Sequence, residues 1–152
     1  MSSAALATRA PVIVPSDILG DLTVAEDEII RFRSGLVGLP ECRSFVLLRT
    51  ERPDSFWLQS VDHSALAFLL VDPFVFFDGY SVEVGPAEMT ELGAGEDSDI
   101  VLLSIVTLPA SRGGDPTANL QGPLAINLDA RCGKQMVVEG EEFGVRHAFK
   151  LA

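Results

Sequence analysis

The stretch of sequence that decides the fold is IVLLSIVTLPASRGGDPTANLQGPLAINL, which runs from Ile100 to Leu128. It holds two apolar runs, at 100–109 and 124–128, that are rich in β-branched residues and bounded by Pro and Gly. Runs of this kind are typical of buried strands. The stretch therefore predicts two core strands joined by a polar connection.

Polar and apolar side chains alternate within that connection. Thr117, Asn119 and Gln121 are polar, whereas Ala118 and Leu120 between them are apolar. A period of two sends the polar groups to one face of a strand. Each amide offers two donors and an acceptor, so we expect Asn119 and Gln121 either to hold strands together by hydrogen bonds or to face a partner. The same two roles are open to the other amides on predicted strands, Gln59 and Asn127.

Turn and strand signals repeat at short intervals along the rest of the chain. The only predicted helix covers 86–92, with Pro86 at its first position and Gly93 at its end. Asp78-Gly79 and Gly133-Lys134 are predicted turns. Many short strands indicate an all-β fold, a small closed or nearly closed antiparallel β-barrel or sandwich with one short helix. Besides 100–109, the predicted strands cover 11–15, 22–24, 29–32, 45–49, 56–61, 66–71, 80–84, 124–129 and 134–139.

The composition limits the class of partner. A chain of 152 residues that is 47% hydrophobic suits one domain, which we place at 11–152 after a disordered extension at 1–10. Asp and Glu number 22 against 11 Lys and Arg, which gives a net charge of −11. Such a chain repels nucleic acid phosphates and anionic membranes, so a charged partner is expected to be basic. The alternative is that the acidity serves solubility alone.

An aromatic cluster surrounds an Asp-Pro pair. Asp72, which ends an apolar run, is interpreted as a turn residue that hydrogen-bonds nearby backbone amides, with a binding or catalytic acid as the alternative. If the following segment is extended, Phe76 and Phe77 cannot both face the core, and one of them forms an exposed apolar patch of the kind that marks a partner site. Phe56 and Trp57 pose the same question one strand earlier.

Two features argue for a reduced, cytosolic protein. Cys42 and Cys132 are far apart and lack the ligand spacing of a metal site, so free thiols are expected. The first ten residues lack the basic start and sustained apolar core of a signal peptide, and the apolar stretch at 65–77 is too short to span a bilayer.

No group of residues predicts catalysis. Ser60, Asp62 and His63 are near neighbours in sequence, which is poor geometry for a triad. An enzyme, for instance a small hydrolase, would need Asp72 and His147 within hydrogen-bond reach in one pocket. A third alternative is an acidic β-barrel adaptor for some other basic partner.

Short motifs recur from one end of the domain to the other. In addition to the segment at 117–123, they are Phe32-x-x-Gly35-Leu36-x-Gly38, Phe56-Trp57-Leu58-Gln59-Ser60, Ala67-Phe68, Val71-Asp72-Pro73-Phe74-x-Phe76-Phe77-x-x-Tyr80, Val106-Thr107, Gly133-Lys134-Gln135 and Arg146-His147. In their order and spacing they resemble the flagellar assembly factor FliW family, over roughly residues 17 to 148. Gly122 stands where that family commonly has Ala.

The resemblance implies a cytoplasmic binding protein that is not an enzyme and needs no cofactor or metal. FliW-like proteins bind CsrA, an RNA-binding translational repressor, and so relieve its repression of flagellin synthesis. They also bind flagellin, which couples translation to filament assembly. CsrA and flagellin are thus the expected partners, without direct contact to nucleic acid or membrane. The residues expected to bind partners are Phe56, Gln59, Asp72, Phe74, Phe76, Tyr80, Asn119 and Gln121.

Deletion of residues 1–10 is expected to leave both the fold and partner binding intact, because this segment precedes the motifs and carries little apolar surface. The measurement is the melting temperature and the partner affinity of the truncated chain beside those of the full chain. A melting temperature lowered by several degrees would contradict the expectation and show that the segment packs on the domain.

Overall fold

The computed structural model describes residues 11–95 and 97–150, so the extension predicted at 1–10 lies outside the described residues. These residues are mostly β, with two short α-helices, α2 (Pro73–Phe76) and α3 (Pro86–Glu91), and one 3₁₀ turn, η1 (Glu26–Glu28). The strands are β1 (Val12–Val14), β2 (Leu22–Val24), β3 (Ile30–Phe32), β4 (Ser44–Arg49), β5 (Ser55–Ser60), β6 (Ala67–Val71), β7 (Ile100–Thr107), β8 (Thr117–Ala118), β9 (Leu124–Asn127), β10 (Cys132–Gln135) and β11 (His147–Ala148).

Seven strands close into a barrel in the order β3-β4-β5-β6-β7-β9-β10. The eight-residue β7 makes closure possible because its first half pairs with β9 and its second half with β6. The ring is completed by β10 and β3, which pair in parallel, with Cys132 opposite Arg31. The predicted all-β barrel is confirmed, with two corrections within 11–95 and 97–150: one pair of strands is parallel, and there are two short α-helices instead of one.

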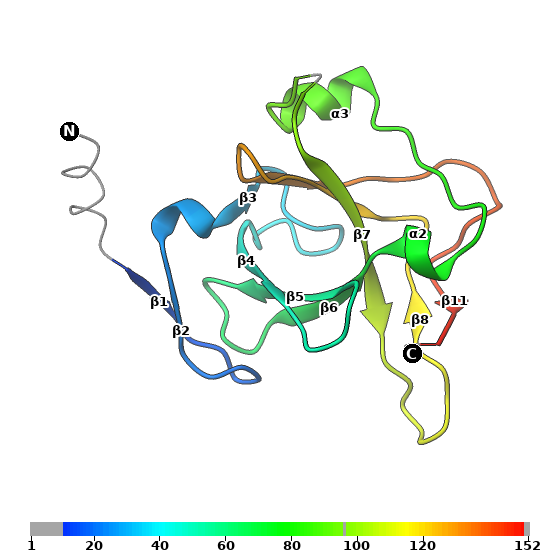
Figure 1. Ribbon diagram of the computed structural model, residues 1–152, viewed down its shortest axis with the longest axis horizontal. Helices are drawn as coiled ribbons and strands as arrows, with labels where there is room; N and C mark the ends of the chain where they lie inside the picture. The colour runs from blue at the N-terminus through cyan, green and yellow to red at the C-terminus, as the bar shows by residue number, and fades with distance from the viewer. Residues whose placement is uncertain (1–10, 96, 151–152) are drawn as a thin grey trace.

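The β1–β2 hairpin lies outside the barrel as a second small sheet, on the left of Figure 1 and far from α2. Its buried residues Val14 and Val24 pack with Ile29 and with Val46 of β4. The hairpin thus covers one part of the outer barrel surface.

Large apolar side chains fill the barrel interior. Phe32 and Phe45 meet edge to face, with ring centroids 5.4 Å apart. A fully buried side chain of this size contributes about 1.5–3 kcal/mol relative to an exposed one. The interior is therefore a packed core and not a channel. Its other fully buried members include Ile30, Leu58, Leu70, Leu124 and Ile126.

The prediction for Gly133-Lys134 is wrong, because both residues lie inside β10. The turn between β9 and β10 comes earlier, at 128–131, where Arg131 has a left-handed φ of 56°. The physical reason for Gly133 is a close approach: a Cβ there would stand 2.5 Å from the Phe32 ring. Glycine is present to make room for the core and not to turn the chain.

The segment at 80–84 is not a strand in the structure, because no neighbouring strand pairs with it. Instead it leads into α3, and its residues Val82 and Val84 pack against Leu92. The helix prediction is confirmed, and α3 ends beside Gly93, whose φ of 62° suits only a residue tolerant of the left-handed region.

The Asp-Pro pair begins α2. Asp72 caps this single helical turn, since its Oδ1 accepts a hydrogen bond from the Phe74 backbone N–H at 3.0 Å. Because the chain turns here, the alternation expected of Phe76 and Phe77 does not apply: both are partly buried and contact Phe149. The large apolar residues of α2 that are exposed are Phe74 and Val75.

Gly133→Ala is expected to destabilise the protein by about 1–3 kcal/mol, because the added methyl group overlaps the Phe32 ring in a packed core. Gly95→Ala is the matched control, since nothing lies within 4 Å of a Cβ placed there. Chemical denaturation of the two variants checks the expectation, and equal stabilities would contradict it.

Candidate functional site

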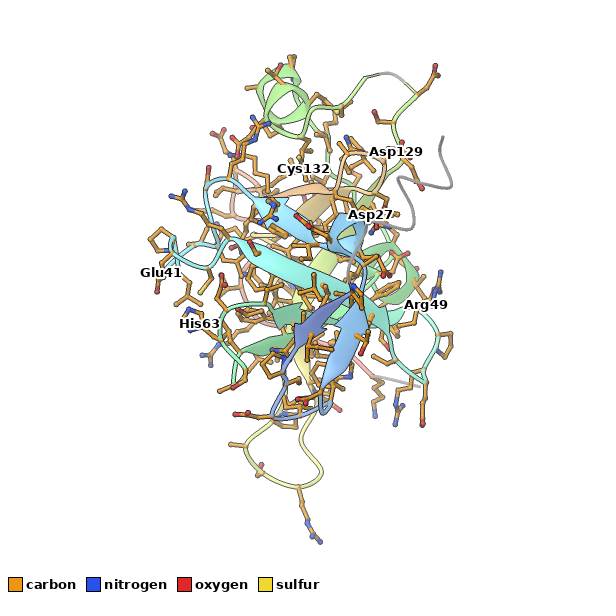
Figure 2. The ribbon with its side chains drawn as sticks, turned by 90° about the vertical axis from the view of Figure 1, so that its left-hand side faces the viewer. Asp27, Glu41, Arg49, His63, Asp129 and Cys132 are labelled. Carbon is orange, nitrogen blue, oxygen red and sulfur yellow. The ribbon has the colours of Figure 1, made fainter. Side chains whose placement is uncertain are left out.

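Three of the expected partner-binding residues, Phe56, Asp72 and Phe74, line one cavity of about 330 Å³. It lies at the end of the barrel where the β4–β5 hairpin, the start of α2 and the start of β7 meet. We call this cavity the barrel mouth, which is lined by Leu47, Arg49, Asp54, Phe56, Asp72, Phe74, Ile100, Val101, Leu102, Leu103 and Leu128. Figure 2 shows Arg49 on the side of the molecule opposite Glu41 and His63.

Backbone contacts bring two carboxylates together at the rim of the mouth. The Asp72 N–H donates to the Asp54 carbonyl at 3.0 Å, which attaches the tip of the β4–β5 hairpin to the end of β6. The tip is held by a hydrogen bond between the hydroxyls of Thr50 and Ser55. Asp54 has a left-handed φ of 61°, which Asp tolerates better than most residues. Sequence reasoning missed Asp54, because no local signal shows that the hairpin tip meets the end of β6.

Arg49 is the cation of the mouth, and it lies against an aromatic ring. Its guanidinium carbon is 5.6 Å from the centroid of the Phe56 ring, within the range of a cation–π contact. Within 11–95 and 97–150, no carboxylate lies within 4 Å of this guanidinium. The negative charges of Asp54 and Asp72 are therefore not neutralised by a direct ion pair.

The rings of Tyr80 and of Phe76, the last residue of α2, pack against other aromatic rings. The Tyr80 hydroxyl is buried and donates to the Leu120 carbonyl at 2.7 Å, and burial raises its pKa to about 12. The Phe74 ring lies 5.5 Å from that of Tyr80, and Phe76 lies 5.2 Å from Phe149. These contacts hold α2 in place while Phe74 remains 44% exposed.

Gln59 is fully buried and away from the mouth. Its Nε2 donates to several carbonyls of the following loop, among them those of Ser60 and Leu66 at 3.0 and 3.2 Å. Asn127 is also buried, and its Nδ2 donates to the Leu92 carbonyl at 2.9 Å. Both amides therefore have a structural role, in which Gln59 fixes the loop after β5 and Asn127 fixes the end of α3.

Asn119 and Gln121 lie at the other end of the barrel, at a hollow of about 260 Å³. Asn119 Oδ1 accepts from the backbone N–H groups of Gln121 and Gly122 at 3.1 and 2.8 Å. This local bonding ends β8 after Ala118, so the strand predicted from the alternation is shorter than expected. We call this surface the valine–amide face: Val37, Asn119, Gln121, Gly122, Gln135, Met136, Val137 and Val145.

A second amide organises the valine–amide face. Gln135 Oε1 accepts from the Val37 N–H at 2.8 Å, and its Nε2 donates to the Gly122 carbonyl at 2.9 Å. A Cβ on Gly122 would lie 2.9 Å from that Nε2, so glycine makes room for the bridge. No hydrogen bond of the Gln121 side chain occurs within the described residues.

The hydrolase alternative requires Asp72 and His147 to be close. In the described part of the chain these side chains form no hydrogen bond with each other; instead, His147 Nε2 accepts from the Gly144 N–H at 2.7 Å. A cluster of three or more His, Cys, Asp or Glu residues able to hold a metal does not occur among the described residues.

Other titratable groups with shifted pKa lie away from the mouth. Lys134 donates to Glu91 at 2.9 Å, which lowers the pKa of that carboxyl and links α3 to β10. Burial raises the pKa of the Cys42 thiol, and both Cys42 and Cys132 are free. Across 11–95 and 97–150, none of the helices has the length and apolar character needed to cross a membrane.

Comparison with known proteins gives one consistent result. The model of the FliW protein family matches residues 13–149. The flagellar assembly factor FliW of Natranaerobius thermophilus is 36% identical over 135 residues, which cover 88% of this chain and 89% of that protein. The Geobacter sulfurreducens protein of the same name is 38% identical, over 86% of this chain and 81% of its own. A crystal structure of the flagellar assembly factor FliW superposes with a TM-score of 0.82 at 33% identity, covering 90% of this chain and 95% of that one.

Asn119→Ala is expected to cost about 1–3 kcal/mol of stability, because two partly buried backbone N–H groups lose their acceptor. Gln121→Ala is the matched control and should leave stability nearly unchanged. Thermal and chemical unfolding of both variants measure the difference. Equal stability of the two would show that the Asn119 carboxamide does not support this turn.

Proposed function

The chain belongs to the FliW family, and from this premise we propose that it is an anti-repressor that binds the translational regulator CsrA and relieves its repression of flagellin synthesis. It also binds flagellin and so couples translation to filament assembly. The observation that carries this proposal is the family match over 13–149, which includes nearly every described residue. The protein acts in the cytoplasm, where both partners are made.

The charge of the chain supports a partner of the first kind. With a net charge of −11, the protein attracts a basic RNA-binding protein and repels the RNA itself. The anti-repressor therefore acts by contacting the regulator and not by competing for the message as a nucleic acid ligand.

Partner exchange supplies the switch. Free protein captures the regulator when flagellin has been exported, and flagellin displaces it when flagellin accumulates. Each outcome follows from relative affinity and mass action, so no covalent chemistry is needed. This agrees with the role of Asp72 as a helix cap and that of His147 as an acceptor for a backbone N–H.

Two surfaces are available for these contacts. The barrel mouth presents Phe56, Asp72 and Phe74, and the valine–amide face presents Asn119 and Gln121. Exposed apolar side chains accompany both, Phe74 and Val75 at the first and three valines at the second. Exposed apolar patches of this kind mark interaction sites.

Calorimetry with the CsrA-type regulator of the same organism is expected to show binding, while a mobility-shift assay with the regulator's RNA target shows none for this protein alone. The −11 charge is the reason for the second result. RNA binding by this protein alone would contradict the proposal. Absence of regulator binding combined with capture of a different basic protein would favour the adaptor alternative.

The association rate with the regulator is expected to fall as salt rises from 0.1 to 1 M, because the screening length shortens from about 10 to about 3 Å. Dissociation should change less. Stopped-flow mixing across that range measures both rates. Charge reversal of the exposed residues Glu139, Glu141 and Glu142, or of the exposed residues Glu26 and Glu28, should reproduce the effect of salt if that cluster faces the regulator. If the association rate does not change with salt, the acidic residues serve solubility alone.

A further inference from the structure

We infer that the barrel mouth is the docking site for one apolar side chain that projects from a cationic segment of a partner protein. This inference rests on the proposed function for the identity of the natural partner but not for the chemistry of the site. It assigns a class of ligand to a cavity that the barrel itself builds.

The size and the walls of the mouth favour a side chain as occupant. At about 330 Å³ the mouth is at the lower limit of cavities that hold small molecules. It cannot extend deeper, because Leu58, Leu70 and Leu124 fill the barrel beneath it and are fully buried. Its walls are mostly apolar, so the part of the ligand that enters must be apolar as well.

The rim of the mouth selects the charge of the ligand. Asp54 and Asp72 are the acidic residues that line the mouth, and Arg49 is the basic one. Two carboxylates thus face a single guanidinium, that of Arg49.

Arg49 offsets only part of this charge and forms no ion pair with it. Its guanidinium lies over Phe56, and none of the carboxylates in the described residues comes within 4 Å of it. With two carboxylates and one guanidinium, the lining keeps a net negative charge beside its apolar wall. A ligand with Lys or Arg beside its apolar side chain satisfies both features at once.

The adjacent helix supplies the remaining contact area. Phe74 and Val75 of α2 are 44% and 54% exposed, although both are large and apolar. Aromatic side chains beside a desolvated pocket are frequent centres of binding energy. An amphipathic helix fits this layout, because residues three and four positions apart lie on one face and can place a cation on each side of the inserted side chain.

The charge argues against two other occupants. A second copy of this chain would bring a second net charge of −11 and a second acidic cavity lining to the contact. Nucleic acid would bring phosphates against Asp54 and Asp72. A cationic protein segment is repelled neither by the net charge of the chain nor by Asp54 and Asp72, so it is the occupant that the charge favours.

Synthetic helical peptides test the chemistry directly. The probe has a central Phe flanked by Lys at i−4, i+3 and i+4; one control peptide replaces the Phe by Ala, and another replaces each Lys by Glu. Each is titrated into the full ¹⁵N-labelled chain at low salt, and affinities come from amide shift changes. The Lys/Phe peptide is expected to bind with shift changes at 49–56 and 72–76, and both controls to bind at least fivefold more weakly. Equal binding of all three, or shift changes confined to 139–142, overturns the inference.

Protein variants give a second, independent test. Asp54→Asn with Asp72→Asn removes two charges, while Asn still tolerates the left-handed φ at 54 and still caps a helix at 72. This double variant should weaken binding of the Lys/Phe peptide about fivefold, and Phe74→Ser should weaken it about tenfold. The matched controls are Asp17→Asn with Asp21→Asn, two exposed acids away from the mouth, and Ile18→Ser, which removes an apolar side chain that is 56% exposed. Circular dichroism checks that each variant is folded. If the control variants weaken binding of the peptide and the mouth variants do not, the inference is overturned.

The natural regulator separates this inference from the proposed function. If the regulator binds the wild-type chain and binds both mouth variants equally well, the inference fails and the proposed function stands. If the regulator does not bind but the Lys/Phe peptide binds at the mouth, the proposed function fails and the inference stands. Sedimentation that shows a dimer disrupted by Phe74→Ser would assign the mouth to a second copy and overturn the inference.

Discussion

The barrel depends on one strand that changes its neighbour along its length. β7 pairs with β9 through 100–103 and with β6 through 104–106. Because a single continuous strand belongs to both ladders, the sheet closes on itself instead of ending in two exposed edges. Ser104 lies at the change of partner and is fully buried. A small side chain at this point suits the close approach of three strands. The same half of β7 that pairs with β9 also forms a wall of the barrel mouth, so closure and the site have one origin.

Much of the strand pattern could be predicted, because short apolar runs between Gly, Pro and Asp residues are local signals. The closing pair could not be predicted, because Arg31 and Cys132 are far apart in the sequence and nothing local links them. Gly133 shows the limit of local reasoning. Its sequence context is that of a turn, whereas its role is set by the Phe32 ring, which no neighbour in sequence reveals. Tertiary packing, and not turn formation, therefore explains why position 133 is a glycine.

The candidate site shows the same division. Asp72 could be interpreted from its own neighbourhood, because Asp before Pro commonly caps a turn, and Phe74 followed from the aromatic cluster beside it. The alternation rule failed for Phe76 and Phe77 because it assumes an extended chain, and Pro73 instead starts a helical turn. Asp54 gave no signal at all. Its place at the rim comes from a backbone hydrogen bond to Asp72 that depends on how the barrel folds.

Carboxylates that are held in place differ physically from the other acids on this surface. Asp72 uses one oxygen to cap α2, so its carboxylate is positioned before any partner arrives, and the backbone that carries the Asp54 carboxylate is bonded to that of Asp72. Glu139, Glu141 and Glu142 have longer side chains on an exposed segment and must lose rotamer freedom when they pair with a cation. Exposed pairs of that kind add little affinity, although their charge still accelerates encounter. The distribution of acids thus separates two tasks. In the proposed function, the exposed glutamates attract a basic partner from a distance. In the docking mode inferred above, the charged and apolar lining of the barrel mouth determines where that partner is held and in which orientation.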